Sequence, residues 1–310
     1  MAFKTEGYEK VPGVVVPDHS IVGDIVCSLL SVLFGKRFDS HGLTEGSGFY
    51  NTPDLTVYNH ICNHKLPFNS HQERNHFKVP LNLIHFSLVA KIFTHADLNE
   101  ELKSKLIAAS KFYQQALQTC EIDPEVAYLH LISAGEIISA HYSYEQEELL
   151  DDVTLNYLDK IRTNTPEGEK IARHISNRIL SIKSRFVKTL ISLIDDDFFS
   201  SKEGSNGFGF FQKEDFEKRI GAAYDLRSKY VHTGVPFGNW IKPTGRIEDV
   251  QLGKPVVPDK EYAKILAKAP TFIGLERTMR YCILKFMATN GFDELSRAAG
   301  VSSLACSHDS

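Results

Sequence analysis

The feature of this sequence that most restricts its fold is a succession of long segments in which apolar residues return every three or four positions. The first starts after residue 97, with apolar residues at Leu102, Leu106, Ala109, Tyr113, Ala116 and Leu117. That spacing gathers apolar side chains on one side of an α-helix, and such a side must be buried against a neighbouring element. The sequence therefore predicts a mainly α-helical protein.

Start and stop signals divide the helical region into separate segments. Asp123 is a suitable N-cap and Pro124 a suitable first residue for a second helix. Its expected buried positions are Val126, Leu129, Ile132, Ala140 and Tyr144. A third segment keeps helical spacing for six turns, from Ile171 to Leu193. The last helices are expected at residues 259–269 and, restarted by a proline, from 270 to about 290.

The first 97 residues follow a different pattern. One helix is expected between Ile21 and Gly35, with Asp18 or Ser20 as its cap, and glycines and prolines then interrupt residues 36–80. This part is either a cap, a partner-binding region or a piece of the same helical body. The chain is thus expected to divide into an extension of mixed helix and loop at 1–97, a helical domain at 98–290 and a disordered tail at 291–310.

Composition limits the classes of function. The formal charge of −4 argues against nucleic-acid binding over the whole surface, so any RNA contact must be local. Five scattered cysteines without paired spacing favour reduced thiols and a cytoplasmic location. The apolar run from Ile21 to Phe34 is interrupted by Asp24 and is too short to span a bilayer, so no membrane partner is expected.

Two residues near the end of a segment that starts at about Glu214 carry candidate chemistry. Arg227 lies near the middle of an apolar helical face formed by Phe216, Ile220, Ala223, Tyr230 and Val231. A guanidinium in such a place needs an anionic partner. His232 follows at the helix end, where Gly234 is a stop signal, and an imidazole ordinarily titrates near neutral pH. A fixed cation and a proton-transfer group are what metal-independent cleavage of a phosphodiester needs.

Residues Leu226–Gly234, which read Leu-Arg-Ser-Lys-Tyr-Val-His-Thr-Gly, resemble the Arg-x4-6-His signature of HEPN domains. They are most similar to the Apea-like branch, which typically reads Arg-Ser-x-x-x-His-Gly; Thr233 before the glycine is a departure. The resemblance covers roughly residues 98–290. It implies an antiparallel helical bundle that usually dimerises and often cleaves RNA without a metal, in toxin, antiphage or abortive-infection systems. Some members of the family are inactive and serve as binding or scaffold modules.

The expected function is therefore an endoribonuclease of the HEPN type in which Arg227 and His232 are catalytic. Expected partners are single-stranded RNA, a second copy of the chain and an antitoxin or defence-system protein. A two-fold dimer with the helix ends facing each other is predicted because it would supply two arginines and two histidines. Ser228 and Tyr230 are supporting candidates, although Tyr230 is also a natural core residue.

Glu136 is the expected partner of Arg227, because it lies on or beside the apolar stripe of the second helix. Two interpretations stay open. The pair either fixes the register of two helices or orients a catalytic arginine, and one carboxylate can do both. Under the first interpretation the protein is a non-catalytic interaction module. Either way, the sequence predicts that the two side chains lie close enough to interact.

Candidate RNA-binding residues lie on two segments. Lys170, Arg173, Arg178, Arg185 and Lys188 fall beside the apolar stripe of the third segment, where acidic residues are nearly absent. A charged helix face is usually just solvated, so this is the weaker interpretation. In the long loop at 233–258, Trp240, with Phe237, Lys242 and Arg246, is suited to stacking on bases. The alternative is that Trp240 plugs a groove and holds the loop down.

Other patterns are expected to carry no cofactor and no metal. The cluster of His60, Cys62, His64, His71 and His76 lacks a second regularly spaced ligand pair, so a zinc hydrolase is the least favoured class. The three acids at 195–197 are expected to begin a solvated loop after a helix. The glycines at 204–209 lack the preceding strand and following lysine of a phosphate loop.

Overall fold

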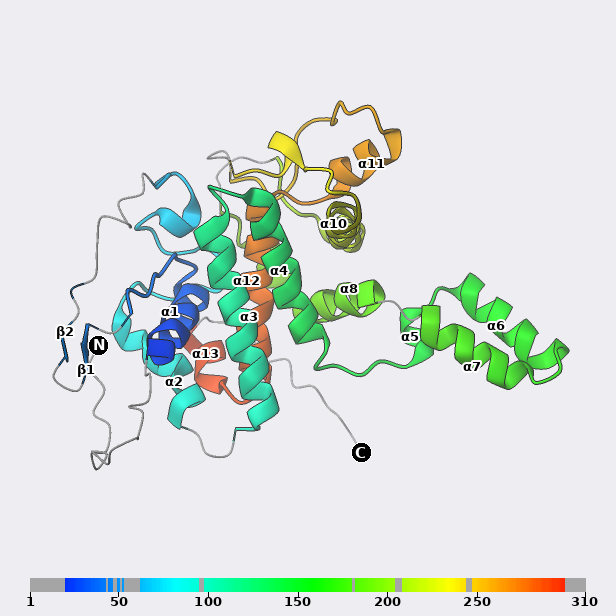
Figure 1. The fold of residues 1–310 in the computed structure, drawn as a ribbon, viewed down its shortest axis with the longest axis horizontal. Coiled ribbons are helices and arrows are strands. Elements are labelled where there is room, and N and C mark those ends of the chain that lie inside the picture. The colour runs from blue at the N-terminus through cyan, green and yellow to red at the C-terminus, as the bar shows by residue number, and fades with distance from the viewer. Residues whose placement is uncertain are drawn as a thin grey trace.

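The structure is a computed structural model that describes residues 20–42, 44–46, 49–50, 52, 62–94, 98–179, 182–203, 208–243 and 247–298. The protein is mainly α-helical (Figure 1). Its longer helices are α1 (Ser20–Phe34), α3 (Glu100–Thr119), α4 (Pro124–Ser139), α6 (Asp152–Asn164), α7 (Gly168–Ile179), α8 (Ile182–Leu193), α10 (Lys213–Thr233) and α12 (Phe272–Thr289). The shorter ones are α2 (Ser87–Thr94), α5 (Gln146–Leu149), α9 (Asp196–Ser200), α11 (Lys260–Lys268) and α13 (Asp293–Ala298), with 3-10 turns η2 (Pro67–Asn69), η3 (Leu83–Phe86) and η4 (Gly238–Trp240). Among the described residues, β1 (Glu45–Gly46) and β2 (Phe49–Tyr50) form one short antiparallel pair.

Helix α12 is the centre of the core. It packs against α1, α3, α4 and α8, and almost all of its residues are buried. Two glycines allow this close packing. A Cβ atom at Gly135 of α4 would lie 2.4 Å from the Phe186 ring of α8, and one at Gly274 of α12 would lie 2.2 Å from the Asp249 carbonyl oxygen. Both positions therefore require glycine for the neighbouring segments to approach.

The helix boundaries that depend on local chemistry are confirmed. Helix α4 begins at Pro124, and the Asp123 side chain accepts a hydrogen bond from the Val126 N–H at 3.0 Å. Helices α1 and α10 end at Gly35 and Gly234, which have left-handed φ angles of 60° and 68°. Only glycine adopts this conformation without a steric penalty, so these residues stop the helices.

The segment from Ile171 to Leu193, expected as a single helix, is helical in α7 and in α8, and residues 180–181 between these two helices lie outside the described residues. Helix α7 packs against α6 in a hairpin that stands away from the body, whereas α8 packs against α4 and α10 (Figure 1). The apolar residues of the two halves serve different neighbours: Ile171 is exposed on the hairpin, and Phe186 is buried in the main core. Apolar spacing indicates which side of a helix is apolar, but not which neighbouring element packs against that side.

The buried face of α4 also differs from the expected one. Of the expected positions, Ile132 is buried, Val126 and Leu129 are only half-buried and Ala140 is exposed. Ala127, Tyr128, Leu131 and Ile138, which were not expected, are buried as well. The reason is that α4 contacts α3, α8, α10 and α12, so neighbours cover more than one side of it. The buried face of α4 is therefore broader than the single apolar stripe that was predicted from the sequence.

The three acids at 195–197 do not begin a solvated loop. Asp195 is the N-cap of α9 and accepts a hydrogen bond from the Asp197 N–H at 3.2 Å. The same carboxylate also accepts from Lys285 Nζ at 2.8 Å and from the Tyr281 hydroxyl. Acidic side chains are unfavourable at the C-terminus of a helix, where the dipole is negative, but favourable at the N-terminus of the next helix. The three acids therefore start α9 instead of a solvated loop.

Residues on both sides of position 97 share one core. Helix α1 packs against α3 and α12, and Leu66, Phe68 and Phe77 belong to the same buried cluster as α12. The described residues before position 97 are therefore part of the helical body, which is one of the three alternatives left open by the sequence.

The beginning of the expected tail is helical. Residues Asp293–Ala298 form α13, which packs against α2 and α12 and buries Leu295. The acids Asp293 and Glu294 in its first turn favour a helix start, a signal too short to stand out in the sequence. Residues 299–310 lie outside the described residues. No helix formed by the described residues combines the length and the apolar character needed to cross a membrane.

Candidate functional site

Helix α10 positions the residues singled out in the sequence. Glu214 and Asp215 lie in its first turn, where acidic side chains are favoured, and Phe216, Ile220 and Leu226 are buried along its inner face. The left-handed Gly234 ends the helix, and the Gly234 N–H donates to the Tyr230 carbonyl at 2.8 Å. The last turn of α10 is consequently held at the protein surface.

The predicted proximity of Arg227 and Glu136 is confirmed. Arg227 Nη2 lies 3.5 Å from Glu136 Oε2, and the two side chains are 28% and 21% exposed. The other carboxylate oxygen accepts a hydrogen bond from the Tyr224 hydroxyl at 2.7 Å. The Arg227 guanidinium also lies 5.5 Å from the centre of the Tyr224 ring. Glu136 therefore holds both side chains, and it holds the arginine through one long contact.

Tyr224 acts as a hydrogen-bond donor in this group. Burial, together with its hydrogen bond to Glu136, raises the pKa of Tyr224 to about 12. The hydroxyl therefore keeps its proton at neutral pH and continues to donate to Glu136. The sequence did not single out Tyr224, although its spacing of three residues from Arg227 places it on the same helical face.

His232 lies in the last turn of α10 and is exposed. It follows Arg227 by five residues, which corresponds to a rise of about 7.5 Å along the helix. No hydrogen bond or ion pair within the described part of the chain joins His232 to Arg227 or Glu136. The site therefore has a tethered cation and, separately, a solvent-accessible imidazole.

The two supporting candidates differ in their surroundings. Tyr230 packs its ring against Phe237 at 5.3 Å and contacts the main core, so it has a structural role. Ser228 is half-buried next to Arg227. Neither side chain is brought to Glu136 by a hydrogen bond among the described residues.

The basic residues expected to contact RNA lie on α7 and on α8. Arg173 is exposed on α7 and lies 3.6 Å from Glu169, and Arg178 is on the same helix, with its side chain outside the described set. Arg185 is half-buried on α8. Lys188 of α8 contacts the Glu148 carboxylate at 3.1 Å. A single continuous basic face does not follow from these positions.

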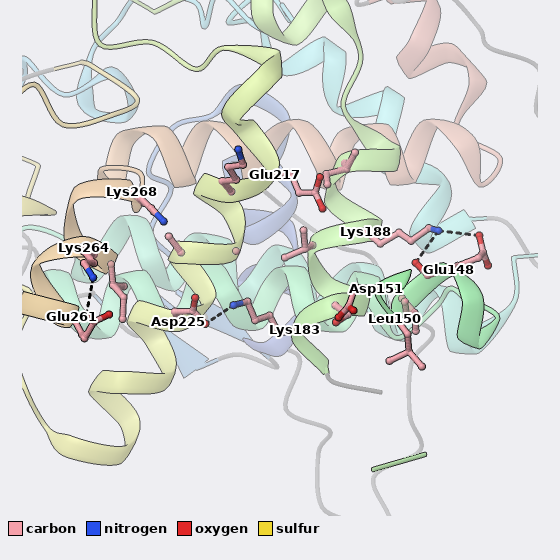
Figure 2. Close-up of a pocket in the computed structure, with 18 residues that line it drawn as sticks. Glu148, Leu150, Asp151, Lys183, Lys188, Glu217, Asp225, Glu261, Lys264 and Lys268 are labelled. Carbon is pink, nitrogen blue, oxygen red and sulfur yellow. Dashed lines mark hydrogen bonds and ion pairs between the residues drawn. The ribbon is translucent and has the colours of Figure 1, made fainter. Parts of the chain in front are cut away.

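A groove of about 960 Å³ runs along the other side of α10, bordered by α5, α8 and α11 (Figure 2). Lysines and acids alternate along it: Lys183 pairs with Asp225 at 2.6 Å, and Lys264 pairs with Glu261 at 2.7 Å. Asp225 and Arg227 point about 160° apart around the helix axis. The groove is therefore distinct from the Arg227 site, and its acids disfavour a polyanion.

The segment after α10 does not present all of its aromatic residues. Phe237 is buried against Tyr128 and Tyr230, so it is not free to stack on a base. Trp240 is half-buried, with part of its indole against the core and part lining a cavity. Lys242 is exposed, and Arg246 lies outside the described residues.

The sequence analysis missed a set of buried charges around α12, which we call the α12 charge cluster: Arg74, His76, Glu203, Asp249, Glu276, Arg277 and Arg280. Arg74 donates to both oxygens of Glu276, at 2.8 and 2.7 Å, and to Glu203 at 2.7 Å. The Tyr113 hydroxyl also donates to Glu276. A signal was available, since Glu276, Arg277 and Arg280 interrupt the apolar pattern of α12 as Arg227 interrupts that of α10.

Within this cluster, Arg280 and His76 depart from ordinary protonation behaviour. Arg280 donates to four backbone carbonyls, those of Val32, Leu33, His76 and Phe77. Burial and then the charge of Arg74 lower the pKa of Arg280 to about 10. Burial lowers the pKa of His76 well below its ordinary value, although its Nδ1 lies 2.7 Å from Glu203 Oε1.

The histidine-rich segment does not assemble a metal site within the described residues, where no three His, Cys, Asp or Glu side chains are grouped suitably. His64 and His71 have ring centres 6.5 Å apart, and His76 is buried beside Glu203. His60 lies outside the described residues.

Compared with protein-family models, curated proteins and solved structures, the chain matches none of them. Function must therefore be argued from the chemistry of the site, and not from the fold.

Proposed function

We propose that the protein is a metal-independent endoribonuclease of the HEPN type that cleaves single-stranded RNA. The observation that carries this proposal is the partial exposure of Arg227 at the end of α10, with the exposed His232 in the following turn. Among the described residues Arg227 makes one long ion-pair contact, with Glu136, so most of its N–H groups stay available for a phosphate. The resemblance of residues 226–234 to the HEPN signature supports the same roles.

The reaction follows from these two groups. His232 removes the proton of a ribose 2'-hydroxyl, and the oxygen attacks the adjacent phosphorus. Arg227 stabilises the negative charge that develops on the phosphoryl oxygens. The bond from phosphorus to the 5'-oxygen breaks, and this oxygen takes up a proton. The products are a 2',3'-cyclic phosphate and a 5'-hydroxyl, and no water is consumed in this step.

A two-fold dimer would provide the second proton-transfer group. In such a dimer, the His232 of one copy acts as base and that of the other protonates the leaving oxygen. An apolar surface beside the site suits self-association, because Val231 and Val235 are 52% and 37% exposed. Helices α4 and α10 run antiparallel, because Glu125 contacts Phe237 and Glu136 contacts Tyr224. The first turns of α4 therefore lie beside the end of α10.

The dimer is tested by light scattering during gel filtration, with cleavage followed across a dilution series. We expect specific activity to fall as the dimer dissociates. A monomer that keeps full specific activity on dilution would rule out a shared site. The resemblance further suggests a toxin or antiphage system in which a partner protein holds the enzyme inactive.

Cleavage itself is tested with a labelled single-stranded RNA and the matching DNA, both in EDTA. We expect the RNA alone to be cut and to end in a 2',3'-cyclic phosphate. His232→Ala should lower the rate by about two to four orders of magnitude. His174→Ala, which removes an exposed histidine of α7, is the matched control and should leave the rate unchanged. Equal loss in both variants, or none in either, would place the chemistry elsewhere.

The second candidate function is a non-catalytic interaction module. It is favoured by the fact that Arg227 already has a protein partner, since Glu136 joins it to Tyr224. Under this alternative the end of α10 binds a protein, and RNA is not cleaved under any of the conditions above. Loss of dimerisation in Val231→Glu, without any cleavage by the wild-type protein, would support it.

A further inference from the structure

A cavity of about 510 Å³, which we call the Ser70 cavity, lies where the chain leaves α1 and meets η2. It shares no residue with the groove of Figure 2, and neither Arg227 nor His232 lines it. The proposed cleavage of RNA therefore does not use it. The residues that line it include Lys36, Phe38, Ser70, Leu81 and Leu83.

Lys36 brings an amine to the hydroxyl of Ser70. It follows Gly35, whose left-handed φ angle ends α1, and its Nζ lies 3.1 Å from Ser70 Oγ. Both groups also reach the Pro67 carbonyl, to which Lys36 Nζ donates and Ser70 Oγ donates at 3.0 Å. An amine within hydrogen-bond reach of a hydroxyl is the arrangement in which a base activates a serine nucleophile.

The two residues differ in exposure in the way that this chemistry needs. Lys36 is 7% exposed, so water has little access to it. Ser70 is half-buried and lines both the Ser70 cavity and a neighbouring cavity of about 720 Å³. Only the nucleophile has to reach a substrate, whereas the base has to reach only the nucleophile.

The surroundings of Lys36 favour its neutral form. Burial, and then the charge of Arg74, lower the pKa of Lys36 to about 8. Arg280 acts in the same direction, whereas Glu203 and Glu276 oppose it. About a tenth of the side chain is therefore neutral at pH 7, and more at higher pH. A neutral amine accepts a proton from a neighbouring hydroxyl, which an ammonium group cannot do.

A second serine shows that the turn at Ser70 does not itself need the lysine. Ser70 and Ser87 are the C-cap residues of η2 and η3, and each donates to the carbonyl three residues earlier, at 3.0 and 2.9 Å. Within the described part of the chain, no lysine contacts the Ser87 hydroxyl. The contact of Lys36 with Ser70 is therefore an addition to this local structure.

Apolar side chains form another part of the cavity wall. Leu81 and Leu83 line the cavity although they are 41% and 65% exposed, and Phe38 is half-buried beside them in the same wall. Apolar surface that is left open at a cavity favours an apolar ligand, and the volume falls within the range of about 300 to 1,000 Å³ that small-molecule sites have. The cavity therefore suits a small substrate with an apolar group.

We propose that Ser70 and Lys36 are the nucleophile and the general base of a second active site, which hydrolyses carboxylic esters with a small apolar acyl group. Pairs of serine and lysine are one of the variants in which nucleophilic serine catalysis occurs. The His71 N–H meets no acceptor among the described residues, so it is free to donate to the oxygen that becomes negative. The inference does not depend on the cleavage of RNA.

The reaction has two balanced steps. In the first, Ser70 Oγ attacks the ester carbonyl carbon and its proton passes to the neutral Lys36 amine. The bond from this carbon to the alcohol oxygen breaks, and Lys36 returns the proton to that oxygen. In the second step, water attacks the acyl group on Ser70, Lys36 takes a proton from the water, and Ser70 leaves and recovers the proton. The products are a carboxylic acid and an alcohol.

The nucleophile is tested with an alkyl fluorophosphonate, which forms a bond from phosphorus to an activated serine oxygen and releases fluoride. Mass spectrometry of the folded wild-type protein locates the adduct. We expect it on Ser70, and not on Ser87, which has the same local hydrogen bond without the lysine. Heat-unfolded protein should not react, because the serine and the lysine are then no longer held together.

Variants separate the roles of the two residues, with p-nitrophenyl butyrate as the substrate. Ser70→Ala should lose both labelling and hydrolysis, and Lys36→Met should slow both by about two to four orders of magnitude. Lys36→Arg keeps the charge and the donors for Pro67 but cannot accept a proton, so it should be as slow as Lys36→Met. Ser87→Ala is the matched control and should behave as the wild type does. Unfolding temperatures check that each variant is folded.

The pH dependence of the wild-type protein distinguishes a base from a purely structural lysine. Lys36 accepts a proton only when it is neutral, so hydrolysis should increase as the pH rises towards about 8 and then level off. No adduct on Ser70 in the folded wild-type protein would overturn the proposal. Labelling of Lys36→Arg at the wild-type rate, or hydrolysis that Ser70→Ala retains in full, would overturn it as well.

Discussion

The α12 charge cluster and the end of α10 both place an arginine against a carboxylate, but with different geometry. Arg277 is 1% exposed and contacts both oxygens of Asp249, at 2.8 and 2.6 Å. It also donates to the carbonyls of Phe198 and Ser201 and lies 3.9 Å from the centre of the Phe198 ring. Arg227 is 28% exposed and contacts one oxygen of Glu136 at 3.5 Å.

This difference separates a structural arginine from one that is free to bind an anion. Arg277 uses its donors on groups of the protein, so a ligand could contact it only by breaking buried hydrogen bonds. Arg227 is oriented by Glu136 and Tyr224, yet most of its five N–H groups meet no acceptor among the described residues. Arginine in an apolar helical stripe is therefore not sufficient to identify a functional site. The number of donors left over, together with partial exposure, is the better criterion.

The largest effect is expected for Glu276→Ala, which leaves Arg74 buried without its bidentate partner. Loss of one partner from a buried ion pair typically lowers the free energy of unfolding by about 3 to 5 kcal/mol. Urea denaturation followed by circular dichroism measures this. Glu217→Ala, which truncates an exposed glutamate in the second turn of α10, is the matched control and should change stability by about 0.5 kcal/mol or less. A loss below about 1 kcal/mol for Glu276→Ala would remove the distinction drawn above.

The second prediction compares coupling energies in the two arginine pairs. A double-mutant cycle with Arg277→Met and Asp249→Ala should give a coupling of about 2 kcal/mol or more, because the pair is buried and doubly hydrogen-bonded. The equivalent cycle with Arg227→Met and Glu136→Ala should give about 1 kcal/mol or less, as partly exposed pairs do. Both cycles use free energies of unfolding. Equal coupling in the two pairs would contradict the comparison.

The sequence was informative where local chemistry sets the structure. Pro124 after Asp123 starts α4, and Gly35 and Gly234 stop α1 and α10, because each residue has a backbone or capping property that acts within one turn. The approach of Arg227 to Glu136 was also predictable, since each interrupts an apolar stripe. Patterns of this kind need no knowledge of the tertiary fold.

Features that depend on long-range packing were not predictable. One example is that α7 packs against α6 whereas α8 packs against α4 and α10, although the apolar spacing is similar in both. The partners of Arg277 and Glu276, namely Asp249 and Arg74, come from distant loops without periodicity. Apolar patterns indicate which residues are buried, but not which charges meet.

The third prediction concerns acid stability and His76. Burial first, then Arg74 and Arg280, hold its pKa well below the ordinary value, while Glu203 opposes them. The unfolded chain therefore binds a proton below about pH 6.5 that the folded protein does not. His76 thus contributes stability that is present above that pH and is lost as the pH falls, by up to about 1.4 kcal/mol per pH unit.

The comparison with His76→Gln isolates this contribution between about pH 5 and 6.5. Burial also lowers the pKa values of His130 and His141, so both proteins keep a common slope. We expect the free energy of unfolding to fall less steeply with acid in the variant than in the wild type. Identical slopes would show that His76 is protonated in the folded protein.

The smallest effect on stability is expected for Glu136→Gln. The variant keeps an oxygen that accepts from Tyr224 but loses the charge that orients Arg227. Because both members of the pair are partly exposed, we expect unfolding to become easier by about 1 kcal/mol or less. RNA cleavage should fall clearly more, by about 10-fold or more, as it does when a residue that orients a functional group is removed.

Stability and cleavage should both be measured on the same preparations. A substitution in the α12 charge cluster should change mainly stability, whereas one at the end of α10 should change mainly cleavage. Glu276→Ala should change unfolding strongly, whereas its surviving folded fraction should cleave RNA at the wild-type rate per molecule. Glu136→Gln should barely change unfolding and should slow cleavage. Arg227→Lys extends the test, because it keeps the charge but loses the planar set of donors that suits a phosphate. If Glu136→Gln were to lose about 3 kcal/mol or more, the Arg227 pair would belong with the buried structural pairs, and the interaction module would become the better account of the end of α10.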